Sequence, residues 1–488
     1  MNTREKFSSR LGFLLISAGC AVGLGNVWRF PYITGQYGGA AFVLIYLVFL
    51  VLLGLPIMTM EYSVGRASQK SAARSFEELE PEGTKWHFIK LVPLVGNYML
   101  MMFYTTVGGW MLAYFFKTAA GSLSGRNAQQ INASFSGFLA SPSQQVLWML
   151  VVIVIGFFIC SRGLRNGVEK ISKYMMGALF LVMIVLVVHS FLLSGAKEGL
   201  AFYLIPDFGR ALEHYSLGEI IFAALGQAFF TLSLGIGALA IFGSYIGKDH
   251  SLVSESLNVV VLDTLVALFS GLIIFPACFT YNIDAGSGPG LIFVTLPATF
   301  NEMAGGRVWG SLFFAFMAFA ALTTIIAVFE NIVAFAMDFG WTRKKAVAVN
   351  AVVVILLSLP CALGFNLLSG FQPFGAGSTV QDLEDFIVSN TLLPLGSLLY
   401  LLFCTYRYGW GWKNYSQEVN SGKGLKLPNW TKGYISYVLP LIVIFILVDG
   451  YLEKLGFPAN YLLPVFCLIY PGYLMVQSYM VHRKKKKL

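Results

Sequence analysis

The chain has 488 residues, of which 57% are hydrophobic and only 12% are charged. Soluble proteins of this length carry about a quarter charged residues, so the composition excludes a soluble globular protein and predicts a polytopic membrane protein. The net charge of +9 comes largely from basic residues between and after the apolar segments, which favours a membrane-surface role over binding to nucleic acid.

Apolar runs long enough to cross about 30 Å of hydrocarbon recur along the whole chain. We predict an all-α protein with twelve transmembrane helices, at about 11–35, 39–64, 91–117, 145–161, 174–194, 218–245, 255–281, 308–337, 346–365, 385–406, 433–453 and 460–481. The polar N-terminus leads directly into the first of them, which argues against a cleavable signal peptide. The apolar segment 288–303 is too short to span, so we expect an interfacial or re-entrant helix there.

The basic residues are distributed unequally between the two sides of the predicted membrane. Alternate connections, from the N-terminus to the tail HRKKKKL, hold most of the 33 Lys and Arg residues. The positive-inside rule therefore places both termini in the cytoplasm. Short termini and the absence of a cysteine pair in any loop favour a prokaryotic source and hence the plasma membrane.

Two of the predicted helices contain interruptions. The first reads GCAVGLGNVWRFPY over 19–32, and the sixth reads FFTLSLGIGALAIF over 229–242. Glycine in a helix interior costs about 1 kcal/mol relative to alanine, and backbone groups freed by a break must be buried in protein or line a polar cavity. Glycines in membrane helices also serve close packing, but interruptions in corresponding helices of two halves indicate a transporter site between inverted repeats.

Several motifs occur in order and resemble those of the neurotransmitter:sodium symporter family, especially its bacterial amino acid transporters. They are GCAVGLGNVWRFPY, GGAAFVLIYLVFLVLLGLPIMTMEYSVGR, GQAFFTLSLGIG and AALTTIIAV, and the resemblance runs from Arg4 through the tenth span. It implies a leucine-transporter-like fold, with a 5+5 inverted repeat, unwound helices 1 and 6, and two peripheral helices. The first repeat would occupy residues 1–200, the second 201–410, and the last two helices with the basic tail 411–488.

The resemblance also implies two sodium sites and no organic cofactor. The first sodium would be bound by the substrate carboxylate with Ala21, Asn26, Thr231 and Asp263, and the second by Gly19, Val22, Ala320, Thr323 and Thr324. Oxygen ligands of this kind suit a hard cation.

Asp263 stands where the family often has asparagine, and Ala267 stands where it has serine. A carboxylate in an apolar span is costly and normally faces a functional partner. We hypothesise that Asp263 supplies the negative charge that chloride supplies elsewhere, so that transport does not require chloride. Other members of the family bind chloride near this position, and two residues of that site, Tyr46 and Gln227, are present here. Weak binding of an anion is therefore left open.

The position at which amine transporters of the family carry aspartate is Gly23 here, so the substrate would bring its own carboxylate. The resemblance places around a zwitterionic α-amino acid Ala21, Gly23, Gly25, Tyr104, Phe230, Leu232 and Ser233. It places around the substrate side chain Leu100, Val107, Phe230, Ile236, Thr324 and Val328. That lining has no charged residue, which favours a hydrophobic or aromatic L-amino acid. The family's leucine transporter has an aromatic residue in place of Ile236, whose loss frees volume for a larger substrate. Leu100 takes some of that volume back, so the size of the substrate is left open.

The resemblance further implies two gates. The outer gate would pair Arg29 with Asp385, assisted by Gln227, and the inner gate would pair Arg4 with Asp338, near Ser244 and Tyr245. An arginine before a first span is also explained as a topology determinant. Two more acids lie in apolar spans: Glu61 fits a structural role, and Glu330 has no role beyond a hypothesis of proton coupling.

Together these features predict a sodium-coupled symporter that carries its amino acid across a lipid bilayer by alternating access. A sodium-dependent sensor with the same fold, or a channel, is the alternative, although the chain has no repeated filter segment or ring of charge. It also has no Ser/His/Asp or metal-ligand constellation, so we do not expect an enzyme. The sequence does not indicate the oligomeric state.

Overall fold

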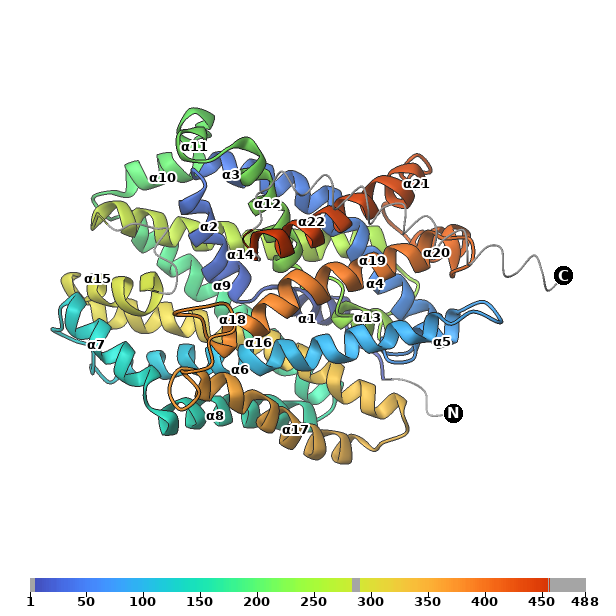
Figure 1. Cartoon of the computed structure of the whole chain (residues 1–488), viewed down its shortest axis with the longest axis horizontal. Helices are drawn as coiled ribbons and strands as arrows, with labels where there is room; N and C mark the ends of the chain where they lie inside the picture. Colours follow the sequence, from blue (N-terminus) through green and yellow to red (C-terminus); the bar gives the residue numbers. More distant parts are fainter. Residues whose placement is uncertain (1–4, 283–289, 455, 457–488) are drawn as a thin grey trace.

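The computed structural model describes residues 5–282, 290–454 and 456, and this part of the chain is a bundle of helices packed side by side (Figure 1). Within it, nine helical segments are long and apolar enough to cross a membrane, or ten when the bent first pair is taken as one span. The sixth predicted span is divided into two helices that are too short to pass this test. The predicted twelfth helix, 460–481, lies outside the described residues.

The helices of the first half follow the predicted order, with short helices between the spans. Their bounds are α1 (Arg10–Ala21), η1 (Gly25–Arg29), α2 (Phe30–Gln36), α3 (Ala40–Phe49), η2 (Leu50–Gly54), α4 (Leu55–Ser68), α5 (Ser75–Leu79), η3 (Trp86–Lys90), α6 (Leu91–Ala119), α7 (Ala128–Leu139), α8 (Pro142–Ser161), η4 (Leu164–Glu169), α9 (Lys170–Ser190) and α10 (Ala196–Leu204).

The second half continues in the same way. Its bounds are α11 (Phe208–His214), α12 (Leu217–Thr231), α13 (Ala238–Ser244), α14 (Leu252–Thr280), η5 (Leu291–Thr295), α15 (Leu296–Glu302), α16 (Gly306–Asp338), α17 (Arg343–Gly364), α18 (Val380–Phe386), η6 (Ile387–Leu392), α19 (Leu393–Thr405), α20 (Gly411–Val419), α21 (Thr431–Gly433), η7 (Tyr434–Val438) and α22 (Leu439–Lys454). The pair η5 and α15 occupies the segment expected to be an interfacial or re-entrant helix.

Side-chain caps determine where some of these helices begin. At α12, Ser216 and Glu219 form a reciprocal capping box, and Thr379 and Asp382 form another at α18. Each box satisfies backbone N–H groups that have no partner within the helix. The start of the sixth and tenth spans is therefore encoded locally.

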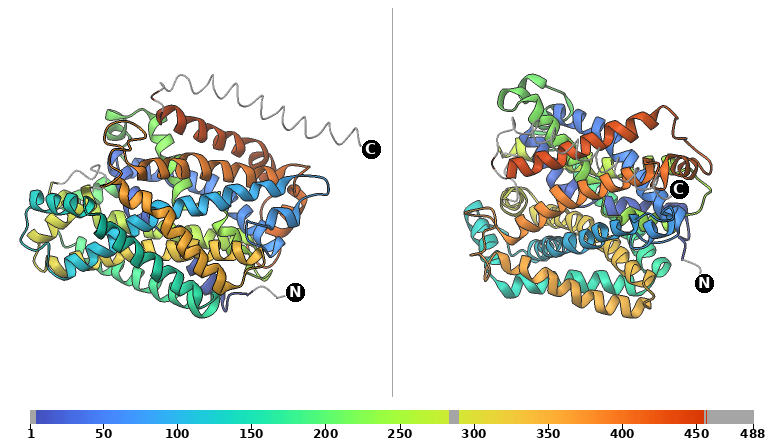
Figure 2. Two further views of the ribbon diagram at one scale, coloured as in Figure 1. Left: turned by 60° about the horizontal axis from the view of Figure 1, so that its bottom comes forward. Right: turned by 45° about the vertical axis from the view of Figure 1, so that its right-hand side comes forward.

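Helices α16 and α6 form the centre of the bundle. Of the apolar stretch of α16, 83% is buried, against 28% for residues 164–190 and 33% for α17. In Figure 2 the blue-green helices of residues 142–190 run along the outer side. These outer helices expose large apolar side chains such as Val154, Phe158 and Leu181. An outer surface of this kind suits contact with lipid tails rather than with water.

The first span breaks where its glycines predict. Helix α1 ends at Ala21, Val22 has an extended backbone, and the following helical segment is bent by 57° from α1. The last carbonyl groups of a helix have no N–H partner within it. The break therefore leaves carbonyl oxygens in the middle of the bundle that can bind a ligand.

The sixth span breaks between α12 and α13. Ser233, Gly235 and Gly237 have positive φ angles of 50°, 91° and 68°, a backbone region that glycine adopts easily. The N–H of Gly235 donates to the fully buried carboxylate of Glu61 in α4. Glu61 therefore satisfies a backbone group that the break releases, which the protein interior requires.

Candidate functional site

A buried cluster of oxygen atoms lies where the first break meets α12 and α14. The Asn26 amide donates to Asp263 Oδ1 at 2.8 Å, and the Thr231 hydroxyl donates to Asp263 Oδ2 at 3.2 Å. All three side chains are fully buried, and the Asn26 carbonyl accepts from Ser270 at 2.7 Å. A carboxylate, an amide and a hydroxyl converging in this way match the oxygen ligands that a hard cation requires.

A second cluster joins the end of α1 to the middle of α16. The hydroxyl of Thr324 lies 3.2 Å from the Gly19 carbonyl, 3.0 Å from the Val22 carbonyl and 3.4 Å from the Ala320 carbonyl. The neighbouring Thr323 hydroxyl lies 3.0 Å from the same Ala320 oxygen. One hydroxyl has one proton to donate, so several carbonyl oxygens here share it and retain lone pairs for a cation.

A cavity, which we call the central cavity, borders the breaks of the first and sixth spans and is also lined by side chains of α6, α16 and α19. Its lining residues are Ala21, Gly23, Gly25, Leu100, Tyr104, Phe230, Ser233, Thr324 and Leu393. One end is polar, because the Tyr104 hydroxyl accepts from the Leu24 N–H at 2.8 Å beside the glycine backbone. Ser233 and Thr324 are hydroxyl residues, the side chains of Leu100, Phe230 and Leu393 are apolar, and no charged side chain belongs to this lining.

Two glycines of the first break make room for this cavity. A Cβ atom at Gly23 would overlap the Tyr104 hydroxyl and lie 2.8 Å from Thr324 Oγ1, and one at Gly25 would lie 2.9 Å from the Phe230 ring. Both distances are shorter than a normal contact. The glycines therefore allow polar side chains and bare backbone to approach the same small volume.

Some residues expected around a substrate are buried near the cavity without lining it. They are Val107, Leu232, Ile236 and Val328. Conversely, Leu393 lines the cavity although sequence reasoning did not select it. A leucine within an apolar span carries no signal that could have distinguished it from core leucines.

A family model described as the sodium:neurotransmitter symporter family matches residues 4–135 and 126–483. The chain belongs to this family.

The sequences of relatives align with the symporter over nearly its whole length. An uncharacterized sodium-dependent transporter of Bacillus subtilis is 35% identical over 446 residues, which cover 91% of this chain and 97% of the relative. Another uncharacterized sodium-dependent transporter, from Haemophilus influenzae, is 31% identical over 459 residues, which cover 92% of this chain and 98% of the relative. The crystal structure of MhsT in complex with L-phenylalanine matches with a TM-score of 0.81 at 37% identity, covering 92% of this chain and 100% of that chain.

The symporter is therefore a sodium-dependent, multi-pass membrane transporter with bacterial relatives. The predicted family and the leucine-transporter-like fold are confirmed. Its family and its structural neighbour are transporters and not enzymes.

The Phe230 ring, which belongs to the lining of the central cavity, is covered by a cation. The Arg29 guanidinium lies 4.4 Å from the centre of the Phe230 ring, and the Gln227 amide donates to the Gly25 carbonyl at 3.0 Å. Asp385 accepts a hydrogen bond from Ser389 at 2.7 Å. Arg29, Phe230 and Gln227 are thus brought together, and the pairing of Arg29 with Asp385 stays a prediction.

Glu330 forms the centre of a buried ion-pair network. Its two carboxylate oxygens accept from Arg343 at 2.7 and 2.9 Å, and the Tyr245 hydroxyl donates to it at 3.1 Å. The Arg343 guanidinium also donates to the Cys160 carbonyl at 3.1 Å. Sequence analysis gave Glu330 no role, and the structure makes it the link between α13, α16 and the start of α17.

The predicted inner gate is only partly described. Arg4 lies outside the described residues, so its pairing with Asp338 remains a prediction. Asp338 accepts from the Ser71 N–H at 2.7 Å, and Ser244 donates to the Ile241 carbonyl of its own helix at 2.6 Å. Among the described residues, Tyr245 hydrogen-bonds to Glu330, whereas the Ser244 hydroxyl bonds within its own helix.

Breaking this network should destabilise the symporter strongly. Arg343→Ala is expected to lower the free energy of unfolding by about 3–5 kcal/mol, because it leaves the buried Glu330 carboxylate without its cation. Adding Glu330→Gln should recover much of that loss. Unfolding in detergent measures both variants, with Glu77→Gln as control because the Arg74–Glu77 pair is exposed and its atoms are 3.6 Å apart. A loss for Arg343→Ala no larger than that of the control would contradict this expectation.

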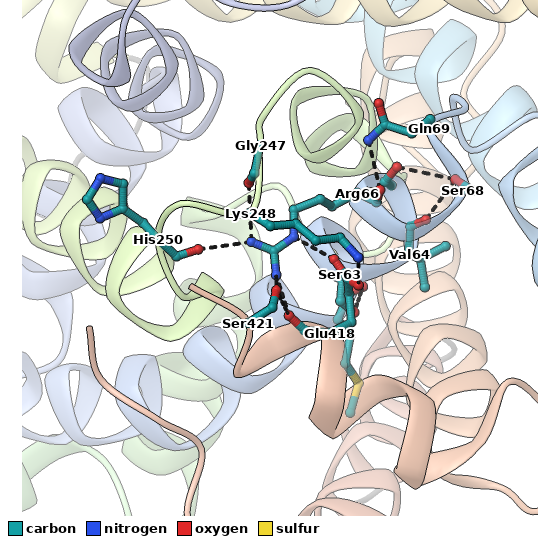
Figure 3. Close-up of polar contacts among 12 residues, drawn as sticks. Ser63, Val64, Arg66, Ser68, Gln69, Gly247, Lys248, His250, Glu418 and Ser421 are labelled. Carbon is teal, nitrogen blue, oxygen red and sulfur yellow. Dashed lines mark hydrogen bonds and ion pairs between the residues drawn. The ribbon is translucent and has the colours of Figure 1, made fainter. Parts of the chain in front are cut away.

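A second buried ion pair ties α4 to the segments after α13 and α19 (Figure 3). The Arg66 guanidinium donates to Glu418 Oε1 at 2.6 Å, to the His250 carbonyl at 2.9 Å and to the Ser421 hydroxyl at 2.6 Å. Lys248 reaches the other Glu418 oxygen at 2.8 Å. Because the Arg66 side chain bonds to groups in two other segments, the cluster joins three parts of the chain: α4, the residues that follow α13, and the end of α20.

Glu384 is a buried acid next to the predicted gate residue Asp385. Its side chain is 3% exposed, and neither carboxyl oxygen has a hydrogen-bond partner of normal geometry among the described residues. The Cys361 thiol lies nearby and is only a weak donor. Burying a carboxyl group with so weak a partner is costly. We expect Glu384→Met, which keeps the shape and removes the polar group, to raise the free energy of unfolding by about 1–3 kcal/mol. The matched change Glu418→Met should lower it, and a loss of stability in both variants would contradict the expectation.

Proposed function

We propose that the symporter imports hydrophobic or aromatic L-α-amino acids together with sodium, by alternating access. The observation that carries this proposal is the central cavity, which offers Tyr104 and glycine backbone at one end and Leu100, Phe230 and Leu393 along its walls. A carboxylate and an ammonium group can be bound at the polar end, and an apolar side chain can be buried against the walls. MhsT, the structural neighbour, was crystallised with L-phenylalanine.

Two sodium ions are proposed to travel with the substrate. The cluster of Ala21, Asn26, Thr231 and Asp263 would hold the first, and the substrate carboxylate would complete its coordination. The second would lie among Gly19, Val22, Ala320, Thr323 and Thr324. The physical source of coupling is mutual ligation, since sodium and substrate each lack part of their coordination without the other.

Asp263 is proposed to make chloride unnecessary. Its carboxylate is fully buried and its described partners, Asn26 and Thr231, are neutral, so the cluster carries a fixed negative charge when Asp263 is ionised. Sodium would neutralise that charge, as a buried carboxylate requires. The Gln227 Oε1 and Tyr46 hydroxyl atoms, buried and without a partner among the described residues, are the remaining groups of the expected chloride site.

The orientation and the gates follow the same proposal. Both termini would face the cytoplasm of a bacterial cell, which places the Arg343–Glu330 network on the inner side and Arg29 on the outer side. Residues 1–200 and 201–410 would act as the two repeats that move against each other around the bound substrate.

Uptake into proteoliposomes tests the proposed function. Labelled L-amino acids would be offered with an inward sodium gradient and with chloride replaced by gluconate. We expect sodium-dependent accumulation of one or a few apolar amino acids. Binding that depends on sodium but leads to no accumulation would instead support a sensor, and accumulation that needs chloride would reject the role given to Asp263.

A further inference from the structure

The tenth span presses against the unwound turn of the sixth. Gly396 in α19 lies so close to Gly235 that a Cβ on it would overlap the Gly235 carbonyl, and a Cβ on Gly235 would lie 2.7 Å from the Ser397 nitrogen. The π-helical turn η6 ends at Leu392, directly before this contact. Two glycines on facing segments therefore allow the backbone of α19 to reach the turn that borders the central cavity.

This close approach places the Leu393 side chain in the wall of the central cavity. Leu393 is 3% exposed and lines the cavity together with Leu100 and Phe230. Ile236, on the unwound turn, packs against α6, where a Cβ on Gly96 would lie 2.7 Å from its Cγ2 atom, and it does not belong to the cavity lining. In this structure Leu393 bounds the volume open to a substrate side chain, whereas the sequence pointed to Ile236.

We propose that Leu393 of the tenth span sets the upper size limit of the transported side chain. The inference rests on the proposed function, since it assigns a role within the same amino acid site. The walls of a close-packed apolar pocket discriminate by volume, and one methylene more or less changes selectivity by about 10-fold or more. A smaller side chain at 393 admits larger substrates, and a larger one excludes them.

The test measures competition against sodium-driven uptake of labelled L-leucine in proteoliposomes. For each variant, the ratio of the half-inhibitory concentrations of L-tryptophan and L-valine is determined, because a ratio cancels differences in expression and overall activity. Leu393→Ala is expected to shift this ratio at least about 10-fold in favour of tryptophan. Leu393→Phe is expected to shift it in favour of valine. Leu393→Val, which removes one methylene, serves where the phenylalanine variant does not fold, and it should shift the ratio towards tryptophan by a smaller factor than Leu393→Ala.

Leu401→Ala is the matched control, since it removes a fully buried leucine side chain from the same helix, α19, at a position outside the cavity lining. Its ratio should stay within about twofold of the wild type. Equal ratios in all Leu393 variants, or an equal shift in Leu401→Ala, overturn the assignment of Leu393. A wild-type protein that accumulates no amino acid would instead reject the proposed function, so the two failures are distinguishable.

Discussion

Asp263→Asn is expected to reduce sodium-driven uptake by about 100-fold or more in chloride-free buffer. The substitution removes the only formal charge among the side chains of the first oxygen cluster, where Asp263 contacts Asn26 and Thr231 at 2.8 and 3.2 Å. Leaving a buried cation without its counter-charge costs about 3–5 kcal/mol, and each 1.4 kcal/mol is a factor of ten in affinity. Initial uptake rates across a range of sodium concentrations measure the loss.

The double variant Asp263→Asn with Ala267→Ser gives the sharper result. It restores the residues that the family often carries at both positions, so uptake is expected to return in part when chloride is present and not when gluconate replaces it. Asp249→Asn, an exposed loop position, controls for a general effect of losing a carboxylate. Undiminished uptake by Asp263→Asn without chloride would show that the carboxylate is not the required charge.

Tyr104→Phe is expected to raise the substrate concentration for half-maximal uptake by about 10–100-fold. The Tyr104 hydroxyl lies at the polar end of the central cavity, where it accepts from the Leu24 N–H at 2.8 Å and can donate its proton to a carboxylate. A hydrogen bond to a charged group contributes about 1.5–3 kcal/mol. Concentration-dependent uptake gives the change, and the maximal rate should fall less than the affinity.

Tyr98→Phe is the matched control for this change. Tyr98 lies on the same helix, α6, and its hydroxyl donates to Asn350 away from the central cavity. Removing the Tyr98 hydroxyl should leave the substrate affinity unchanged. Because Tyr104→Phe also leaves the Leu24 N–H without its acceptor, unfolding without substrate must be measured in parallel, and a change in stability with unaltered affinity would limit Tyr104 to a structural role.

Much of the organisation follows from local features of the sequence. The glycines of GCAVGLGN and SLGIG break the first and sixth spans, because glycine weakens a helix wherever it lies. Asp263 stands out because carboxylates are rare in apolar spans, whereas Thr323 and Thr324 were singled out only through the resemblance to the family. Such signals need no knowledge of the partners, and the order of motifs was specific enough to identify the family and its fold.

The tertiary structure decided which residues meet. Glu61 was recognisable as a buried acid, yet only packing of α4 against the sixth span brings it to the Gly235 N–H. Glu330 likewise pairs with Arg343 only because α17 begins with Arg343 and turns back on α16. Leu393 belongs to the lining of the central cavity, and Ile236 does not. Gly235 and Gly396 allow α19 to lie this close to the unwound turn. The sequence by itself determined where the helices break and where charged groups lie in the spans. Apolar residues in apolar spans look alike in sequence, so the packing of helix on helix decided which of them shape the site.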